Sequence, residues 1–276
     1  MAGCPDTRRA GQPDATAKRE DVKTIALANW KGGVGKTTST ANLGAALAER
    51  GKGVLLVDLD PQANLTEAFG LHEDPHSSIA ELLADPARAD EDDVAEVGPR
   101  LGLVPSSAEM GDLAWELVRE PDYQERLTRV LAALGERYEW ALVDTPPGVG
   151  LWPGLALLAA DAVVIPTRPH DADVMATGKL CDYIEADIRP TNPNLRVLGA
   201  LVTQAQSRWR LLKATRRRFE LDAIDVLEAE IPASVSVAAA PRSGKPTLWL
   251  EPDSKVAYAY RRAAGELLGK IESVHA

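Results

Sequence analysis

Eight consecutive residues near the start of the chain combine glycines, lysines and threonines in an order that suits the binding of a phosphate group: Lys31-Gly32-Gly33-Val34-Gly35-Lys36-Thr37-Thr38. Glycines let the backbone curl so that successive N–H groups point at one anion. Lys36 would neutralise the β- and γ-phosphates of a nucleotide, and the Thr37 hydroxyl would ligate Mg²⁺. We therefore interpret these eight residues as a nucleotide-binding loop, here called the phosphate loop. The alternative is a chance glycine-rich turn beside exposed lysines.

The sequence on either side places this loop between a strand and a helix. An apolar run over residues 24–29 precedes it, and a helical pattern over 37–50 follows it. This context favours phosphate binding, because the positive end of the following helix adds to the field of the loop. The loop departs from the general motif in two ways, with Trp30 where a glycine is expected and with the additional lysine, Lys31. Lys31 is poorly placed to reach its own phosphates and better placed to reach a nucleotide held by a second subunit.

Three aspartates lie at the ends of two further predicted strands. Asp58 and Asp60 lie at the end of the apolar run 53–58, and Asp144 ends the run 140–144. Because phosphate sites in parallel sheets lie at the carboxyl ends of the strands, we expect all three carboxylates to converge on the phosphate loop. Asp144 is placed to hold Mg²⁺ through water. The alternative for each aspartate is a cap of a turn or helix.

The alternation of apolar runs with helical patterns predicts the fold class. Strands are expected at 24–29, 53–58, 101–104, 140–144, 162–166 and 196–203, with 226–231 as a further candidate. Helices are expected at 37–50, 107–118, 122–135, 152–160, 172–187, 207–221 and 254–273. Continuous apolar strands are typical of a parallel sheet with helices on both faces. We predict a single-domain α/β P-loop NTPase with a mostly parallel, twisted sheet over residues 23–276, preceded by a disordered tail over 1–22.

Composition agrees with a cytoplasmic globular protein. The chain has 276 residues, 45% of them hydrophobic, and a net charge of −10. Its two cysteines, Cys4 and Cys181, predict no structural disulfide. No apolar run reaches the ~18 residues that a membrane span requires. The acidic stretch 85–96 is expected to be a solvated loop or surface helix.

The phosphate loop resembles the deviant Walker A motif of the ParA/MinD family of P-loop ATPases. Residues 54–64 are similar to the second motif of that family, and 140–147 resemble its Walker B strand and switch II. Residues 244–246 and 253–260 resemble the C-terminal signature of the partition-type ParA/Soj branch. These segments cover most of the chain and follow the order of the family.

The resemblance implies roles for single residues. Lys31, Lys36 and Asp60 would form the catalytic set, with Asp60 orienting the attacking water. Thr37 and Asp144 would hold Mg²⁺, and Asp58 would support the shell of groups around the metal. In the family the additional lysine acts across a dimer that sandwiches two ATP molecules, so Lys31 would supply its charge in trans.

The resemblance also implies two switch segments, 61–64 and 145–148, that sense the γ-phosphate. Two stretches, 170–173 and 233–236, depart from the family pattern. Contacts to the adenine are expected from Thr203 or Pro232.

A second feature is an uneven charge distribution. No acidic residue occurs between Asp187 and Glu220, although the chain is acidic overall. On a helix over 207–221, one face is apolar and the other is basic. The apolar face carries Leu211, Leu212, Thr215 and Phe219. The opposite face carries Arg210, Lys213, Arg216 and Arg217, with Arg208 and Arg218 at its boundary.

A basic stripe of this kind is typical of contact with phosphate backbones without sequence readout. The stripe therefore predicts non-specific DNA binding by Arg208, Arg210, Lys213, Arg216, Arg217 and Arg218. The alternative is an ordinary solvated helix face. Trp209 would either anchor the helix or stack on a base.

These features favour the partition branch of the family, which implies a weak Mg²⁺-dependent ATPase that is cytoplasmic and nucleoid-associated. Its ATP-bound homodimer would coat non-specific double-stranded DNA, and a ParB-like centromere-binding adaptor would stimulate hydrolysis and release. One alternative is a related ATPase that positions a protein cargo. A MinD-like membrane-cycling regulator is a second alternative, although Glu266, Glu272 and few basic residues in 263–274 make stable membrane association unexpected.

Overall fold

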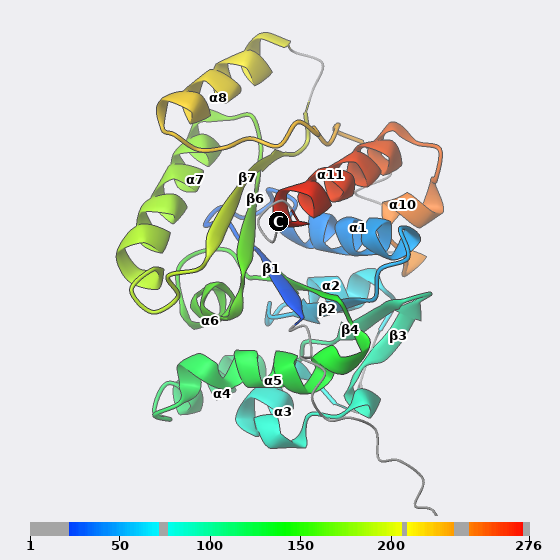
Figure 1. Ribbon diagram of the computed structural model, residues 1–276, viewed down its shortest axis with the longest axis vertical. Helices are drawn as coiled ribbons and strands as arrows, with labels where there is room; N and C mark the ends of the chain where they lie inside the picture. Colours follow the sequence, from blue (N-terminus) through cyan, green and yellow to red (C-terminus); the bar gives the residue numbers. More distant parts are fainter. Residues whose placement is uncertain (1–21, 72–76, 206–208, 235–242, 273–276) are drawn as a thin grey trace, which may run out of the picture.

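The computed structural model describes residues 22–71, 77–205, 209–234 and 243–272. They form a seven-stranded sheet in the order β3-β4-β2-β5-β1-β6-β7 (Figure 1). The strands are β1 (Lys23–Leu27), β2 (Val54–Asp58), β3 (Ala95–Gly98), β4 (Leu101–Val104), β5 (Trp140–Asp144), β6 (Ala162–Thr167) and β7 (Arg196–Val202). Only the β3–β4 pair is antiparallel among these strands, which confirms the predicted α/β class with a mostly parallel sheet. The tail predicted for residues 1–22 lies, except for Val22, outside the described residues.

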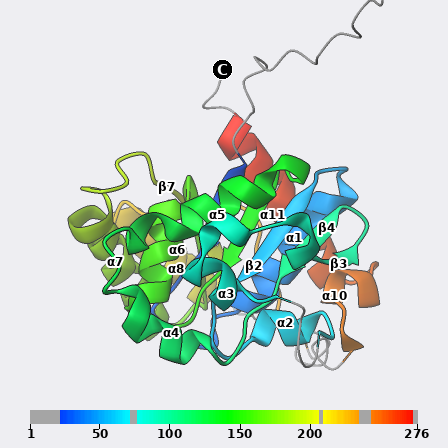
Figure 2. The same cartoon turned by 90° about the horizontal axis from the view of Figure 1, so that it is seen from below.

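Alternation along the strands divides the core into two layers. In β1, Ile25 and Leu27 face one layer, whereas Ala26 faces the other. The first layer holds α1 (Lys36–Glu49), α2 (Asn64–Ala68), α10 (Thr247–Leu250) and α11 (Lys255–Glu272). The second holds α3 (Ile79–Ala84), α4 (Met110–Leu117), α5 (Arg126–Leu134), α6 (Leu151–Ala159) and α7 (Asp171–Tyr183) (Figures 1 and 2). Both faces of the sheet are therefore covered, as the buried residues on both sides of the central strands require.

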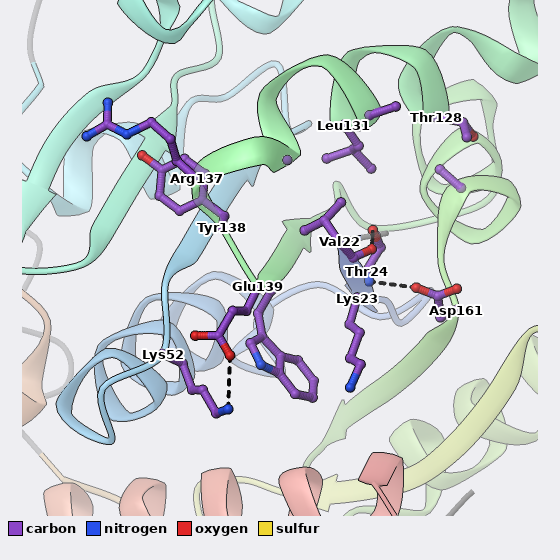
Figure 3. A pocket seen from close by; sticks show the side chains of 14 residues that line it. Val22, Lys23, Thr24, Lys52, Thr128, Leu131, Arg137, Tyr138, Glu139 and Asp161 are labelled. Carbon is purple, nitrogen blue, oxygen red and sulfur yellow. Dashed lines mark hydrogen bonds and ion pairs between the residues drawn. The ribbon is translucent and has the colours of Figure 1, made fainter. Parts of the chain in front are cut away.

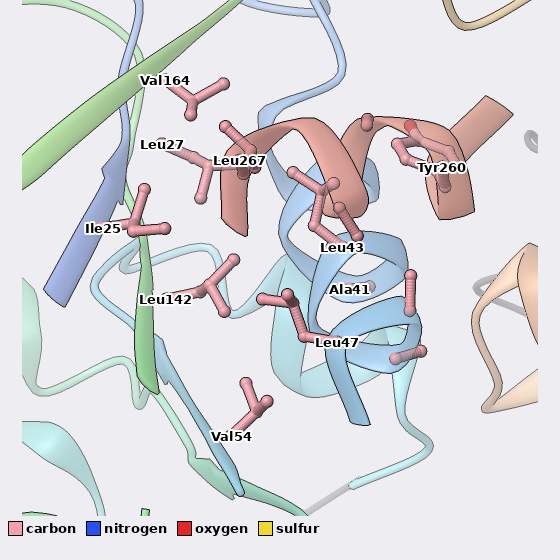
Figure 4. Packing of buried hydrophobic residues seen from close by; sticks show 14 of the residues in the cluster. Ile25, Leu27, Ala41, Leu43, Leu47, Val54, Leu142, Val164, Tyr260 and Leu267 are labelled. Carbon is pink, nitrogen blue, oxygen red and sulfur yellow. The ribbon is translucent and has the colours of Figure 1, made fainter. Parts of the chain in front are cut away.

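Helix α1, which begins directly after the phosphate loop, is packed between the sheet and α11. Figure 4 shows Leu43 and Leu47 of α1 between strand residues such as Leu142 and the α11 side chain of Leu267. Gly44 allows this close approach, because a Cβ atom there would lie 2.6 Å from Leu56 Cδ2. Because α1 is buried on both sides, its N-terminus is held in a fixed orientation at the phosphate loop.

Helix α8 (Trp209–Leu221) packs on α7, near the edge strand β7 (Figure 1). Phe219 of α8 is fully buried against Val174 of α7 and Ala200 of β7, and Thr215 is also buried. The apolar face predicted for this helix is confirmed at these two positions.

The expected strand at 226–231 is wrong. The segment runs along β7 but forms only isolated bridges, Ala200 with Val226 and Ala205 with Pro232. A ladder fails to form because the backbone N–H groups of Glu228 and Ala229 donate to the Glu266 carboxylate of α11. The acidic stretch 85–96 contains two short 3₁₀ turns and the start of β3, and 184–188 continue α7 as a π-helix.

Candidate functional site

The phosphate loop joins the carboxyl end of β1 to α1, as the sequence predicts. Gly33 and Gly35 have φ angles of 72° and 86°, in the left-handed region that glycine adopts without strain. Gly35 is the N-cap of α1. The N–H groups of this turn and the positive end of the helix dipole therefore meet at one point, where an anion is stabilised.

Three side chains from two surrounding segments hold the loop in this shape. Asn29 Oδ1 accepts from the backbone N–H of Lys31 at 3.0 Å, which fixes the start of the loop. At the carboxyl end of β7, Thr203 Oγ1 donates to the carbonyl of Val34 at 2.7 Å, and Gln204 Nε2 donates to the carbonyl of Gly33 at 2.9 Å. The loop is thus attached to β7, the strand that leads into α8.

The two lysines of the loop lie in different environments. Lys36 is only 6% exposed, and its Nζ donates to the Lys31 carbonyl at 3.4 Å. Burial lowers the pKa of Lys36, against the opposing effect of the Asp144 and Asp60 carboxylates. The side chain of Lys31, in contrast, is exposed. Lys36 is therefore buried in the wall of the site, whereas Lys31 is open to solvent.

Asp58 and Asp144 end adjacent strands and are both fully buried. Asp144 Oδ1 accepts from Thr40 Oγ1 at 3.2 Å, while Oδ2 has no hydrogen-bond partner among the described residues. Burial and the neighbouring Asp58 raise the pKa of Asp144 to about 8, and the Thr37 hydroxyl, Lys36 and the Thr40 hydroxyl partly offset this rise. A buried oxygen without a donor beside a second carboxylate is suited to a cation.

Asp58 is engaged in a different way. Its Oδ2 accepts from both the backbone N–H and the hydroxyl of Thr66, at 2.9 and 2.8 Å, and its Oδ1 accepts from the backbone of Asp60 at 3.1 Å. Burial raises the pKa of Asp58 to about 6 despite these bonds. Asp58 therefore positions the segment 60–66 in this structure, and its role in the metal shell stays a prediction.

Asp60 directly precedes the first predicted switch segment, 61–64, and lies 6% exposed at the site. Its Oδ1 accepts from the backbone N–H of Gln62 at 3.0 Å. The second predicted switch segment touches the start of the loop, because Gly148 donates its N–H to the Trp30 carbonyl at 3.0 Å. Trp30 itself packs against Tyr183 of α7, with ring centroids 6.0 Å apart, which explains an aromatic residue at this position.

The residues fit a magnesium ion that is held together with a nucleotide. Among the described residues, no cluster of three or more His, Cys, Asp or Glu could hold a metal by itself. This agrees with Mg²⁺, which proteins commonly bind through one or two carboxylates together with substrate phosphates. The orphaned Asp144 Oδ2 and the Thr37 hydroxyl are the groups that suit this role.

A pocket of about 650 Å³ opens over the phosphate loop. Its lining includes the predicted residues Lys36, Thr37, Asp60, Thr203 and Pro232. Both Thr203 and Pro232, the expected adenine contacts, therefore lie in one cavity with the loop. Pockets of this volume are typical of sites for small molecules and cofactors.

Sequence reasoning missed several residues of this pocket, including Asn42, Glu67, Lys245 and Tyr260. Tyr260 and Ser39 share a hydrogen bond of 3.2 Å, and Asn42 accepts from the backbone of Leu248 at 2.8 Å. The segments around Lys245 and Tyr260 were noticed as a family signature, but their place beside the loop follows only from the packing of α10 and α11 on α1.

The basic residues of α8 differ in what they contact. Arg217 and Arg218 are 69% and 62% exposed at their side chains and pair with Glu220 and Asp222 within or just after the helix. Arg216 departs from the predicted solvent orientation, because it is only 27% exposed and pairs with Glu230. Lys213 is exposed, and Arg208 lies outside the described residues.

A second hollow, of about 740 Å³, lies at the amino ends of the strands (Figure 3). Its charged groups are engaged with neighbours, for example Lys52 with Glu139 at 3.0 Å and Asp161 with the backbone of Thr24 at 2.7 Å. Ligands of open α/β sheets bind at the opposite, carboxyl ends of the strands. The site over the phosphate loop is therefore the candidate for chemistry.

The fold and this site define a P-loop ATPase, and comparisons with known proteins agree. The family profile "AAA domain" matches residues 22–197. The sporulation initiation inhibitor protein Soj of Bacillus subtilis is 34% identical over 250 residues, which cover 89% of this chain and 98% of Soj. The chromosome partitioning protein ParA of Caulobacter vibrioides is 31% identical over 253 residues, covering 90% and 95%.

Among solved structures, cobyrinic acid a,c-diamide synthase of Mycobacterium smegmatis with bound ADP and magnesium has a TM-score of 0.77 at 32% identity. The match covers 91% of this chain and 96% of that one. The chain belongs to the ParA/Soj/MinD family of ATPases with a deviant Walker A motif. No helix in the described part of the chain is both long and apolar enough to cross a membrane.

Proposed function

We propose that this chain is an ATP-dependent DNA partition ATPase, whose ATP-bound homodimer binds non-specific double-stranded DNA and releases it after hydrolysis. The observation that carries the proposal is the contrast between the two lysines of the loop, since Lys36 is buried at the site while Lys31 is exposed outside it. The Soj and ParA relatives, one of them named for chromosome partitioning, support the same function.

Each residue of the site has a role in this proposal. Lys36 and the N–H groups of the phosphate loop bind the phosphates, and Thr37 and Asp144 hold Mg²⁺, which neutralises phosphate charge when it is bound. Asp60 orients the attacking water, and Lys31 reaches the nucleotide of the partner subunit. Because phosphoryl transfer depends mainly on positioning and charge, one added cation has a large effect on the rate. Hydrolysis is therefore weak in the monomer.

The DNA-binding surface is the exposed side of α8. The side chains of Arg217 and Arg218 are largely exposed, and the exposed Lys213 lies on the same helix. A dimer presents two such helices and gains affinity by bivalency. A ParB-like adaptor stimulates hydrolysis, and the ATP-bound form is nucleoid-associated in the cytoplasm.

Binding to a duplex of arbitrary sequence tests this function. Anisotropy would be measured with a non-hydrolysable ATP analogue, with ADP and without nucleotide, across a salt series. We expect binding only with the ATP analogue, with a steep loss of affinity as salt rises. Replacing Arg217 and Arg218 with alanine should reduce the salt slope by about 2 per subunit. Equal and negligible binding in every nucleotide state would remove DNA from the proposal.

A further inference from the structure

A short segment links the basic helix α8 to the nucleotide pocket. After α8 the chain turns back along β7, where Leu227 donates its N–H to Ala200 at 2.9 Å and Ile231 donates to Val202 at 2.8 Å. Ile231 and the following Pro232 line the pocket over the phosphate loop. The segment 227–230 therefore leads directly into the wall of the pocket.

Arg216 joins α8 to this segment. Its Nε donates to Glu230 Oε1 at 3.0 Å, and its Nη2 donates to the carbonyl of Leu227 at 3.0 Å. One guanidinium thus contacts both ends of the segment 227–230. Arg217 offers the contrast, because it pairs with Glu220, three residues away on the same helix.

The other side of the segment is held by α11. The carboxylate of Glu266 accepts from the backbone N–H of Glu228 at 2.9 Å and from that of Ala229 at 3.2 Å. A cation from α8 and an anion from α11 therefore fix the same four residues. This arrangement leaves Arg216 only 27% exposed, which is poorly suited to a phosphate contact on a DNA backbone.

We propose that Arg216 is a positioning residue of the nucleotide pocket rather than a DNA contact. Through Glu230 and Leu227 it holds Ile231 and Pro232 in place, and it transmits changes at this wall to α8. The inference rests on the proposed nucleotide site and, for its effect on α8, on the proposed DNA binding. Because coupling between two binding sites is reciprocal, DNA on α8 would tighten nucleotide binding by the same factor by which nucleotide tightens DNA binding.

A DNA-contact role and a positioning role of Arg216 predict different effects of the substitution Glu230→Gln. If Arg216 were a DNA contact, Glu230→Gln would remove a negative charge beside it and strengthen DNA binding without affecting the nucleotide. If Arg216 is a positioning residue, Glu230→Gln weakens the contact that Arg216→Ala removes, because an uncharged amide oxygen holds a guanidinium less strongly than a carboxylate does. Both substitutions then weaken nucleotide binding.

The test measures the affinity for a fluorescent ATP analogue without DNA, together with the KM and kcat of hydrolysis. We expect Arg216→Ala and Glu230→Gln each to raise the Kd and the KM about three- to tenfold with little change in kcat. The double variant should lose no more nucleotide affinity than the single variant that binds nucleotide less tightly, because the two residues act as one unit. Arg217→Ala is the matched control, with the same loss of charge one residue further on, and should keep the affinity of the wild type.

Wild-type nucleotide affinity in Glu230→Gln, or equal losses in Arg216→Ala and Arg217→Ala, would overturn the inference. Glu230→Gln also decides the case if Arg216→Ala fails to fold, which thermal unfolding would reveal. The DNA assay separates this inference from the proposed function. If the wild type binds no DNA in any nucleotide state, the DNA role fails, whereas the nucleotide affinities still decide the role of Arg216.

Discussion

Asp58 and Asp144 lie opposite each other in the register of β2 and β5, so that two fully buried carboxylates meet below the phosphate loop. Their hydrogen bonding differs. Asp58 accepts three hydrogen bonds through both of its oxygens, whereas Asp144 Oδ2 has no partner among the described residues. Without nucleotide and metal, the buried Asp144 carboxylate therefore lowers the free energy of unfolding. The same carboxylate is the group that suits a cation at the site.

Asparagine at each of these positions should change stability in opposite directions. Asp144→Asn removes a buried charge and keeps the bond from Thr40, so we expect the free energy of unfolding in EDTA at pH 8.5 to rise by about 1–2 kcal/mol. In Asp58→Asn the remaining amide oxygen can still accept from Thr66, but the amide NH2 group then faces the backbone N–H of Asp60, which loses its acceptor. This substitution should therefore lower the free energy of unfolding by about 1–3 kcal/mol. Urea unfolding measures both, and Mg²⁺ should strengthen nucleotide binding in the wild type but not in Asp144→Asn. A loss of stability in both variants would contradict this interpretation of the pair.

The packing of α1 predicts a second contrast. A Cβ atom at Gly44 would lie 2.6 Å from Leu56 Cδ2 and 3.4 Å from Leu101 Cδ1, so Gly44→Ala should destabilise the protein by about 1–3 kcal/mol. Gly178 in α7 is the control, because a Cβ atom there meets nothing within 4 Å. Gly178→Ala should stabilise the protein by about 0.5–1 kcal/mol through the lower entropy of the unfolded chain. Chemical denaturation would show whether the two substitutions have opposite signs.

Cys181 should react slowly at neutral pH. Burial, together with the nearby Asp182 and Glu185, raises the pKa of its thiol to about 11. Because the thiolate is the reactive form, we expect alkylation of the folded protein at pH 8 to be about 100-fold slower than after unfolding, and to accelerate as the pH rises toward 11. Iodoacetamide labelling of a Cys4→Ser variant, followed by mass spectrometry, measures this rate. Equally fast labelling of folded and unfolded protein would show that the thiol has an ordinary pKa.

The phosphate loop and the central strands could be predicted because their signals are local. The glycines at 33 and 35, the apolar runs and the aspartates that follow them are adjacent in sequence. The orientation of Arg216 could not be predicted in the same way, since it depends on Glu230, fourteen residues further along the chain. The expected strand at 226–231 was wrong for a similar reason, because Glu266 of α11 takes two of its backbone N–H groups.

Short elements were also missed. β3 has only four residues, which are partly or fully exposed at the edge of the sheet. A strand of this length is too short for an alternation of apolar and polar residues to be detected. The pocket residues Lys245 and Tyr260 come from the last third of the chain and reach the phosphate loop only through the packing of α10 and α11 on α1. The positions that sequence reasoning misses here are those fixed by contacts between distant segments.

The most direct test of the account asks whether Lys31 acts on the nucleotide of a partner subunit. Lys31→Ala and Asp60→Ala would each be assayed for ATP hydrolysis alone and then as an equal mixture. In a sandwich dimer, the mixed pair contains one site with its own Asp60 and the Lys31 of the other subunit. We predict that neither variant hydrolyses ATP alone and that the mixture recovers about a quarter of wild-type activity, since half of the dimers are mixed and one of their two sites is complete. Hydrolysis by Lys31→Ala alone, or no recovery in a mixture shown to form dimers, would contradict the account.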